Sequence, residues 1–128
     1  MNTTELAEHA VNIKHGGCNC AQAVAMALAE ETGLPEDALR QITAGFGLGM
    51  GTMEGTCGAL VGAGVAAGLK TKGEGTNALT KQMAKAFQET CGAVTCADIK
   101  GVKTGKVLCP CDDCVRNAIR VYAEVAGA

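Results

Sequence analysis

The sequence predicts an all-α protein, a compact bundle of five to six helices around a central helix rich in glycine and alanine. Apolar residues recur at helical spacing along most of the chain, and no segment carries a convincing strand pattern. The central segment has no polar side chain between Cys57 and Leu69, so we expect its neighbours to bury it. The 128 residues favour one domain over 1–128, large enough for a core that needs no disulfides.

Three helices are predicted before the glycine-rich stretch, and they cover 4–15, 20–32 and a segment that begins at Pro35. Thr3 or Thr4 would cap the first helix and Asn19 the second, because their side-chain oxygens can accept from free N–H groups. A glycine follows each helix, as is common where helices end. The residues expected to face inward are Leu6, Ala10, Ile13, Ala21, Val24, Ala25, Leu28, Ala38, Leu39, Ile42 and Phe46.

The stretch 45–69, GFGLGMGTMEGTCGALVGAGVAAGL, organises the rest of the chain. Its first half is too rich in glycine for an ordinary helix or strand and predicts a loop. Its second half predicts a helix over about 56–70, capped by Thr56 and buried all round because it is apolar all round. Glycines 58 and 62 lie on one side of this helix and glycines 64 and 68 on nearly the opposite side, so two neighbouring helices can approach closely.

Two further helices are predicted, one over about 77–90 and one that starts near Asp112. Between them lies a long connection with at most one helical turn, near 96–100. In the last helix we expect Arg116, Asn117 and Arg120 to face solvent. The residues of both helices that we expect to face inward are Leu79, Met83, Ala86, Phe87, Thr90, Val115, Ala118, Ile119 and Tyr122.

Composition excludes several functions. The chain has 11 basic and 13 acidic residues, no basic patch and only three aromatic residues, which argues against nucleic-acid binding. The 13-residue apolar run that ends at Leu69 is shorter than the roughly 20 residues of a membrane span. The N-terminus lacks the pattern of a secretory signal, so we expect a cytoplasmic protein. In that compartment eight cysteines favour metal ligands or redox thiols over structural disulfides.

The cysteine spacings are Cys18-x-Cys20, Cys57, Cys91-x4-Cys96 and Cys109-x-Cys111-x2-Cys114. No segment completes a familiar four-cysteine metal motif. Cys20, Cys57 and Cys111 fall at or near expected helix N-termini, where the partial positive charge favours the thiolate that binds metal or attacks a disulfide. Any single cysteine can instead be a small buried hydrophobe, and Cys91 is the best candidate for that role.

The blocks GCNCAQAV and GFGLGMGTMEGTCGALVGAGVAAGL, followed by Cys96 and by Cys111-x-x-x-Val115, resemble the C_GCAxxG_C_C family of redox-active proteins. The resemblance covers about 18–120. The family's four cysteines fall on Cys20, Cys57, Cys96 and Cys111, where Cys111 is preferred to Cys114 because the family has a cysteine four residues before the valine. The additional thiols are Cys18, Cys91, Cys109 and Cys114.

The resemblance implies an all-helical domain with redox or metal-related work, similar to the iron–sulfur part of split-Soret cytochrome c. Four thiolates suit a [2Fe–2S] or [4Fe–4S] cluster, or zinc as the alternative. The chain has no C-x-x-C-H, so covalent haem is not expected. We expect the backbone near Gly55 and Gly58 to pass close to the site and offer N–H groups to its sulfurs.

Two other functions stay open at this point. The protein can be a thiol–disulfide redox protein or sensor that uses Cys20 with Cys57, or Cys111 with Cys114. It can also be a binding module with structural zinc. The additional thiols can form a second site or a relay. We expect an oxidoreductase as the partner of an electron-transfer protein, and the apolar faces of thin helices allow homo-oligomers; no substrate or catalytic residue is indicated.

Overall fold

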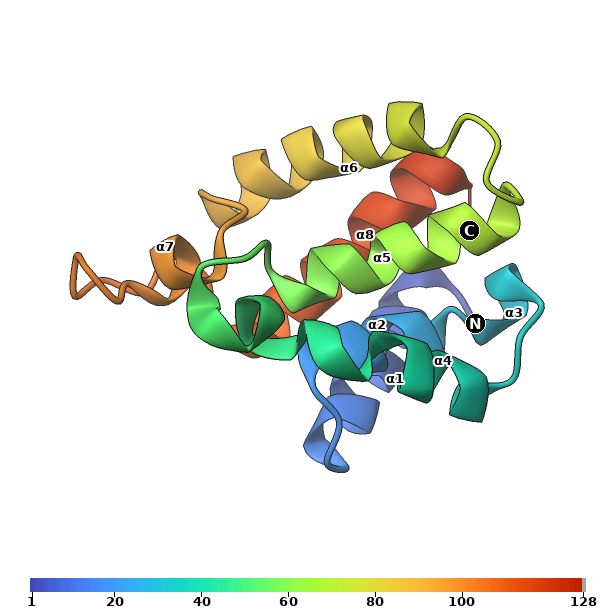
Figure 1. The fold of residues 1–128 in the computed structure, drawn as a ribbon, viewed down its shortest axis with the longest axis horizontal. Coiled ribbons are helices and arrows are strands. Elements are labelled where there is room, and N and C mark those ends of the chain that lie inside the picture. The colour runs from blue at the N-terminus through green and yellow to red at the C-terminus, as the bar shows by residue number, and fades with distance from the viewer. Residues whose placement is uncertain (128) are drawn as a thin grey trace.

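Helices form nearly all of the regular structure in residues 1–127, the part of the chain that the computed structural model describes (Figure 1). The eight α-helices of this part are α1 (Thr3–His15), α2 (Cys20–Ala27), α3 (Ala29–Thr32), α4 (Glu36–Thr43), α5 (Gly58–Lys70), α6 (Thr76–Cys91), α7 (Cys96–Lys100) and α8 (Cys111–Ala126). A 3₁₀ turn over Ala44–Phe46 and a π turn over Gly49–Met53 join α4 to α5. The predicted all-α class is confirmed, since the only β pairing among these residues is one isolated bridge between Thr56 and Thr95.

Helix α5 forms the axis of the bundle, as predicted. It packs against α2, α3, α6 and α8, while α1 packs against α2 and α8. In Figure 1, α5 crosses the middle of the molecule, α6 lies along one side, and α7 with its following loop extends from one end. The largest fully buried side chains are Tyr122, Phe87, Leu28, Leu39, Met83 and Ile119.

Several helix ends differ from the prediction. Asn2, and not a threonine, caps α1, because its side chain accepts from the Glu5 N–H while the Glu5 carboxylate accepts in return. The helix expected over 20–32 is two helices that meet at the buried Leu28. Cys57 takes the N-cap position of α5 in place of Thr56. The count of five to six helices was therefore too low, since the break at Leu28 and the short α7 add two.

The expected burial of three residues, Ile42, Thr90 and Asn117, is wrong, and a hydrogen bond is part of each difference. Ile42 is 46% exposed, and Thr43 is buried instead because its hydroxyl donates to the Leu39 carbonyl within the same helix. Thr90 is exposed and donates to the Ala86 carbonyl in the same way. Asn117, expected at the surface, is 7% exposed and donates to a cysteine sulfur. A buried polar side chain with a partner costs far less than one without.

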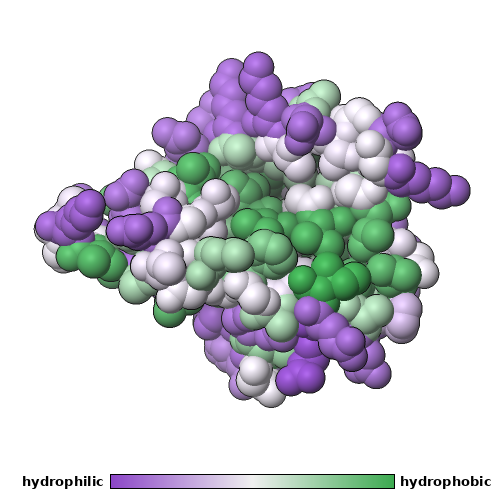
Figure 2. Space-filling model, viewed as in Figure 1, coloured by the Kyte–Doolittle hydropathy of each residue, from purple (hydrophilic) through white to green (hydrophobic). Residues whose placement is uncertain are grey.

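Helix α5 is not buried all round. Val61, Gly64 and Val65 are half-buried and line a shallow groove between α5 and α6, and Gly68 and Leu69 are half-buried as well. Figure 2 shows apolar residues gathered across the centre of this face. The two-sided arrangement of the glycines is nevertheless as predicted, because the first pair faces α2 and the 3₁₀ turn and the second pair faces α6.

We expect Gly62→Ala to destabilise the protein. A Cβ at Gly62 would lie 2.6 Å from the Ala21 carbonyl oxygen of α2, and backbone cannot move aside easily. The free energy of unfolding should fall by about 1–3 kcal/mol, the usual cost of overpacking. Gly64→Ala is the matched control, because its Cβ would meet only the Thr80 methyl, at 3.7 Å. That control should be neutral or gain up to about 1 kcal/mol of helix propensity. Equal effects in chemical denaturation would contradict the close α2–α5 contact.

No helix within residues 1–127 combines the length and the apolar character that crossing a membrane requires.

Candidate functional site

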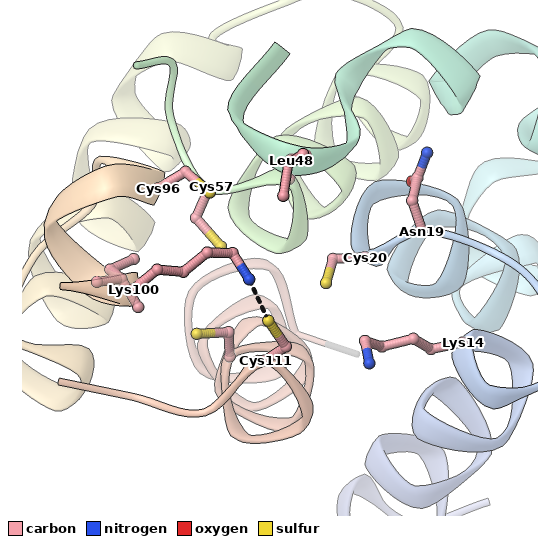
Figure 3. A pocket seen from close by; sticks show the side chains of 11 residues that line it. Lys14, Asn19, Cys20, Leu48, Cys57, Cys96, Lys100 and Cys111 are labelled. Atoms are coloured by element: carbon pink, nitrogen blue, oxygen red, sulfur yellow. Dashed lines mark hydrogen bonds between the residues drawn. The ribbon is translucent and has the colours of Figure 1, made fainter. Parts of the chain in front are cut away.

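Five cysteines line one cavity of about 200 Å³, and four of them, from distant parts of the chain, are labelled in Figure 3. Each of these four lies where a helix begins: Cys57 is the N-cap of α5, and the other three are the first residues of α2, α7 and α8. The helix starts follow from local sequence, since Asn19 forms a capping box with Gln22, and Pro110 precedes α8 at its N-cap. We call this set the pocket cysteines: Cys20, Cys57, Cys96 and Cys111.

The glycine-rich loop shapes one wall of the cavity. The Cys96 N–H donates to the Gly55 carbonyl at 2.9 Å, and the Cys57 N–H donates to the Val94 carbonyl at 2.7 Å. These bonds hold two of the pocket cysteines in neighbouring antiparallel segments. Gly49 has φ +58°, and a Cβ there would lie 2.6 Å from the Cys96 Cβ. Only glycine combines this backbone conformation with such a close approach.

The two loop glycines expected near the site have different positions. Gly58 lines the cavity, and a Cβ on it would lie 2.9 Å from the Phe46 carbonyl oxygen. Gly55 does not line the cavity but contacts a residue that does: its carbonyl accepts a hydrogen bond from the Cys96 N–H. Its own N–H donates to the Gly49 carbonyl at 3.1 Å. Leu48, with φ +54° and 52% exposed, lies at the cavity between the loop and solvent.

Two lysines bring positive charge to the cavity. Lys100 of α7 donates a hydrogen bond to the Cys111 sulfur, and Lys14 reaches the cavity from α1 (Figure 3). The Cys111 sulfur raises the pKa of Lys100, which therefore stays charged. Two ammonium groups beside four sulfurs offset the charge that several thiolates would bring to one cavity. The sequence alone did not point to these lysines, because nothing in their local pattern sets them apart.

The pocket cysteines differ in acidity. A hydrogen bond from Cys114, together with the backbone N–H groups of Ala59 and Leu60, lowers the pKa of Cys57 to about 7 despite burial. Burial raises the pKa of Cys20 to about 12 and also raises the pKa of Cys96. Without a bound cation, Cys57 therefore ionises near neutral pH, because the first turn of a helix stabilises its thiolate.

A second group of thiols lies behind Cys57. The sulfur atoms of Cys91, Cys109 and Cys114 all lie within 4.8 Å of one another, and all three residues are buried. This set, which we call the buried triad, could hold a metal ion. Cys114 joins the two groups, because it also lines the cavity and hydrogen-bonds to Cys57. Cys91, the best candidate for a small buried hydrophobe, is indeed buried at 2% exposure, and its sulfur also belongs to this triad.

The two groups differ in how closely their sulfurs approach. Among the described residues, the triad is the only set of three or more potential ligands whose donor atoms all lie within 4.8 Å of one another. The pocket cysteines surround a space instead of meeting at a point. Cys18 belongs to neither group: it is half-buried with its sulfur 3.9 Å from the Met26 sulfur. All eight cysteines are free thiols in this structure.

Asp112 ties α1 to α8 beside the cavity. Its carboxylate accepts from Lys14 at 2.9 Å and lies 2.8 Å from the His15 ring nitrogen. The hydrogen bond from Lys14, together with that of His15, lowers the pKa of Asp112. A lowered carboxyl pKa stabilises the fold above the ordinary value of about 4, and this stability is lost as the pH falls through the lowered value.

Asp112→Asn should therefore lower the free energy of unfolding by at most about 1 kcal/mol at neutral pH, because the Lys14–Asp112 pair is partly exposed. The difference in this free energy between the variant and the unchanged protein should shrink in acid, where Asp112 is protonated. Urea unfolding at a series of pH values measures this. A difference that persists undiminished below the folded-state pKa would show that the carboxylate charge is not responsible.

Comparison with known protein families gives a match. A family model described as "Putative redox-active protein (C_GCAxxG_C_C)" matches residues 18–125, which contain both thiol groups. Comparison with curated proteins and with solved structures gives no match.

Proposed function

Since this chain belongs to the C_GCAxxG_C_C redox-active family, we propose that it is an electron-transfer protein whose pocket cysteines hold an iron–sulfur cluster. The observation that carries this proposal is the convergence of four thiols from four helix starts on one cavity of about 200 Å³. Such clusters are held in proteins by cysteine thiolates, commonly four of them.

The spacing of the sulfurs favours a cluster over a single zinc ion in this cavity. Zinc–sulfur bonds of about 2.3 Å in a tetrahedron hold the four sulfurs only about 3.8 Å apart. No three pocket cysteines of the described chain have sulfurs all within 4.8 Å of one another. The thiolates of a cluster are shared among two or four iron atoms, so they do not all meet at one ion and can lie farther apart. Structural zinc at this position would require these sulfurs to come closer together.

The surroundings also suit a group that changes charge by one electron. Lys14 and Lys100 offset the negative charge of thiolates, and the remaining lining is largely apolar, including Leu48 and Ile99. Charge, hydrogen bonds to sulfur and solvent exposure are what set the potential of such a cluster. We further propose that electrons pass to and from an oxidoreductase, which would dock where Leu48 and the glycine-rich loop reach the surface.

Metal analysis of protein purified without oxygen tests the proposal. We expect iron, acid-labile sulfide and visible absorption that bleaches on reduction. Stoichiometric zinc without electron uptake would favour a structural metal site instead. Colourless and iron-free protein, also after reconstitution with iron and sulfide, would overturn the proposal.

Lys100 should tune the potential of the bound cluster. Its ammonium group stabilises the reduced, more negative state, so Lys100→Met should lower the reduction potential by about 60 mV, a tenfold change for one electron. Lys100→Arg keeps the positive charge and should therefore keep the reduction potential close to that of the unchanged protein. Lys103→Met is the matched control, because Lys103 is exposed in the loop after α7 and solvent screens its charge. Protein-film voltammetry gives the potentials; an unchanged or raised potential in Lys100→Met would contradict this role.

A second candidate is thiol–disulfide exchange, which one specific contact favours. Cys57, with its pKa of about 7, is hydrogen-bonded to Cys114, and a thiol whose pKa is near ambient pH is an efficient nucleophile. Oxidation of this pair to a disulfide would release two protons and two electrons to a disulfide substrate. Mass spectrometry would then find a reversible two-proton mass change in metal-free protein, whereas a cluster protein would yield free thiols once its metal is removed.

A further inference from the structure

We propose that the buried triad is a second metal site, which binds one thiophilic d¹⁰ ion, Zn²⁺ or Cu⁺, separately from the cavity. Its ligands would be the sulfurs of Cys91, Cys109 and Cys114. Two of these residues, Cys91 and Cys109, contribute nothing to the lining of the cavity, and Cys114 is the one triad residue shared with it.

The geometry of the triad is close to that of a bound state. Three thiolates around one ion at metal–sulfur distances of about 2.3 Å lie about 4 Å from one another, and the three sulfurs already lie within 4.8 Å. Cys91 is the last residue of α6, Cys109 precedes α8, and Cys114 lies in the first turn of α8. A bound ion would therefore clamp the end of one long helix to the start of another across the loop that carries α7.

Asn117 provides the second argument. Its side-chain amide donates to the Cys91 sulfur at 3.1 Å and points to the Cys109 sulfur at 3.7 Å. The Arg120 guanidinium donates to the amide oxygen at 3.4 Å, which keeps the N–H groups aimed at the sulfurs. Donors of this kind are the outer-shell partners that orient and stabilise metal-bound ligands.

Ordinary packing of three small apolar side chains explains this arrangement poorly. Thiols are weak hydrogen-bond acceptors. Hydrogen bonds to thiols alone would therefore offset little of the free-energy cost of removing the Asn117 amide from water. Thiolates accept strongly, and the amide is then well placed.

The two ions would complete the site differently. Thiolates select both Cu⁺ and Zn²⁺. Cu⁺ would be held by the triad alone, whereas Zn²⁺ takes a fourth ligand. A thiol that could supply it is Cys57, the hydrogen-bond partner of Cys114. The experiment must therefore keep Cys57 and disable the cavity by other means.

The test uses the full chain with Cys20→Ser and Cys111→Ser, which removes two pocket thiols and leaves the triad and Cys57 intact. Reduced, metal-free protein is titrated without oxygen with Zn²⁺ and, separately, with Cu⁺ against a chromophoric chelator. We expect one tightly bound equivalent of at least one ion. Adding Asn117→Ala, which removes an outer-shell partner, should weaken metal binding by about 10–100-fold. Adding Cys91→Ser, which removes a ligand, should weaken it by more than about 100-fold.

Cys18→Ser is the matched control and should change nothing, because Cys18 lies outside both groups. If circular dichroism shows that the Cys91→Ser variant does not fold, the test is the rate of thiol alkylation in the Cys20→Ser, Cys111→Ser protein, with and without the ion. One equivalent of the ion should slow alkylation of Cys91, Cys109 and Cys114 together. Binding of neither ion, affinity unchanged by Cys91→Ser in folded protein, or alkylation of the triad unaffected by the ion would each overturn the proposal.

Discussion

Replacing Cys57 by alanine is expected to abolish iron incorporation, the largest effect that any single substitution should have on this protein. Cys57 is the pocket thiol whose pKa is lowered to about 7, and it lies at the junction of the glycine-rich loop and α5. Its loss leaves three ligands for a cluster that takes four. Iron and acid-labile sulfide, measured per chain after anaerobic reconstitution, should fall to background while circular dichroism remains helical.

The matched control is Cys18→Ala, which also removes one thiol of the N-terminal half but none that lines the cavity. This variant should keep its full iron and sulfide content. If both variants lost iron equally, cysteine content and not the cavity would govern metal binding. If Cys57→Ala retained a full complement of iron, the assignment of the pocket cysteines would be wrong.

Gly49→Ala is expected to damage both the fold and the site. Alanine at φ +58° costs about 1–2 kcal/mol, and its Cβ would also lie 2.6 Å from the Cys96 Cβ. With overpacking at about 1–3 kcal/mol, the free energy of unfolding should fall by about 2–5 kcal/mol in total. Because the clash pushes directly on a pocket cysteine, the reconstituted iron content should fall as well.

Gly51→Ala separates these two causes. Gly51 has φ +78° in the same π turn, but no atom lies within 4 Å of its would-be Cβ. This control should therefore show the backbone strain of about 1–2 kcal/mol with normal iron content. Equal losses of stability and iron in both variants would mean that the turn's conformation, and not its approach to Cys96, matters for the site.

Local sequence predicted the helix starts that carry the pocket cysteines, because local interactions produce them. Asn19 caps α2 through its own neighbour Gln22, and α7 appears as the single turn expected near 96–100. The resemblance to known proteins named four cysteines that all line one cavity in the structure, and Cys114 lines it as well. How far apart their sulfurs lie depends on how α2, α5, α7 and α8 pack, which no local pattern contains.

The buried triad could not be predicted in the same way. Cys91 and Cys109 are joined by a connection whose path depends on positive-φ glycines at 92, 101 and 105 and on packing of α7. One signal was present: Cys114 and Asn117 are three residues apart and share a helix face. The helical periodicity of apolar residues in α8 predicted Asn117 on the solvent-facing side. That pattern treats every polar residue as exposed and contains no information on a sulfur partner from another segment.

Anomalous diffraction at the iron absorption edge, from crystals grown without oxygen, tests the central claim most directly. We predict iron peaks inside the cavity, within bonding distance of the sulfurs of Cys20, Cys57, Cys96 and Cys111. Iron that is absent from the cavity of reconstituted protein, or that is bound only by Cys91, Cys109 and Cys114, would contradict the account.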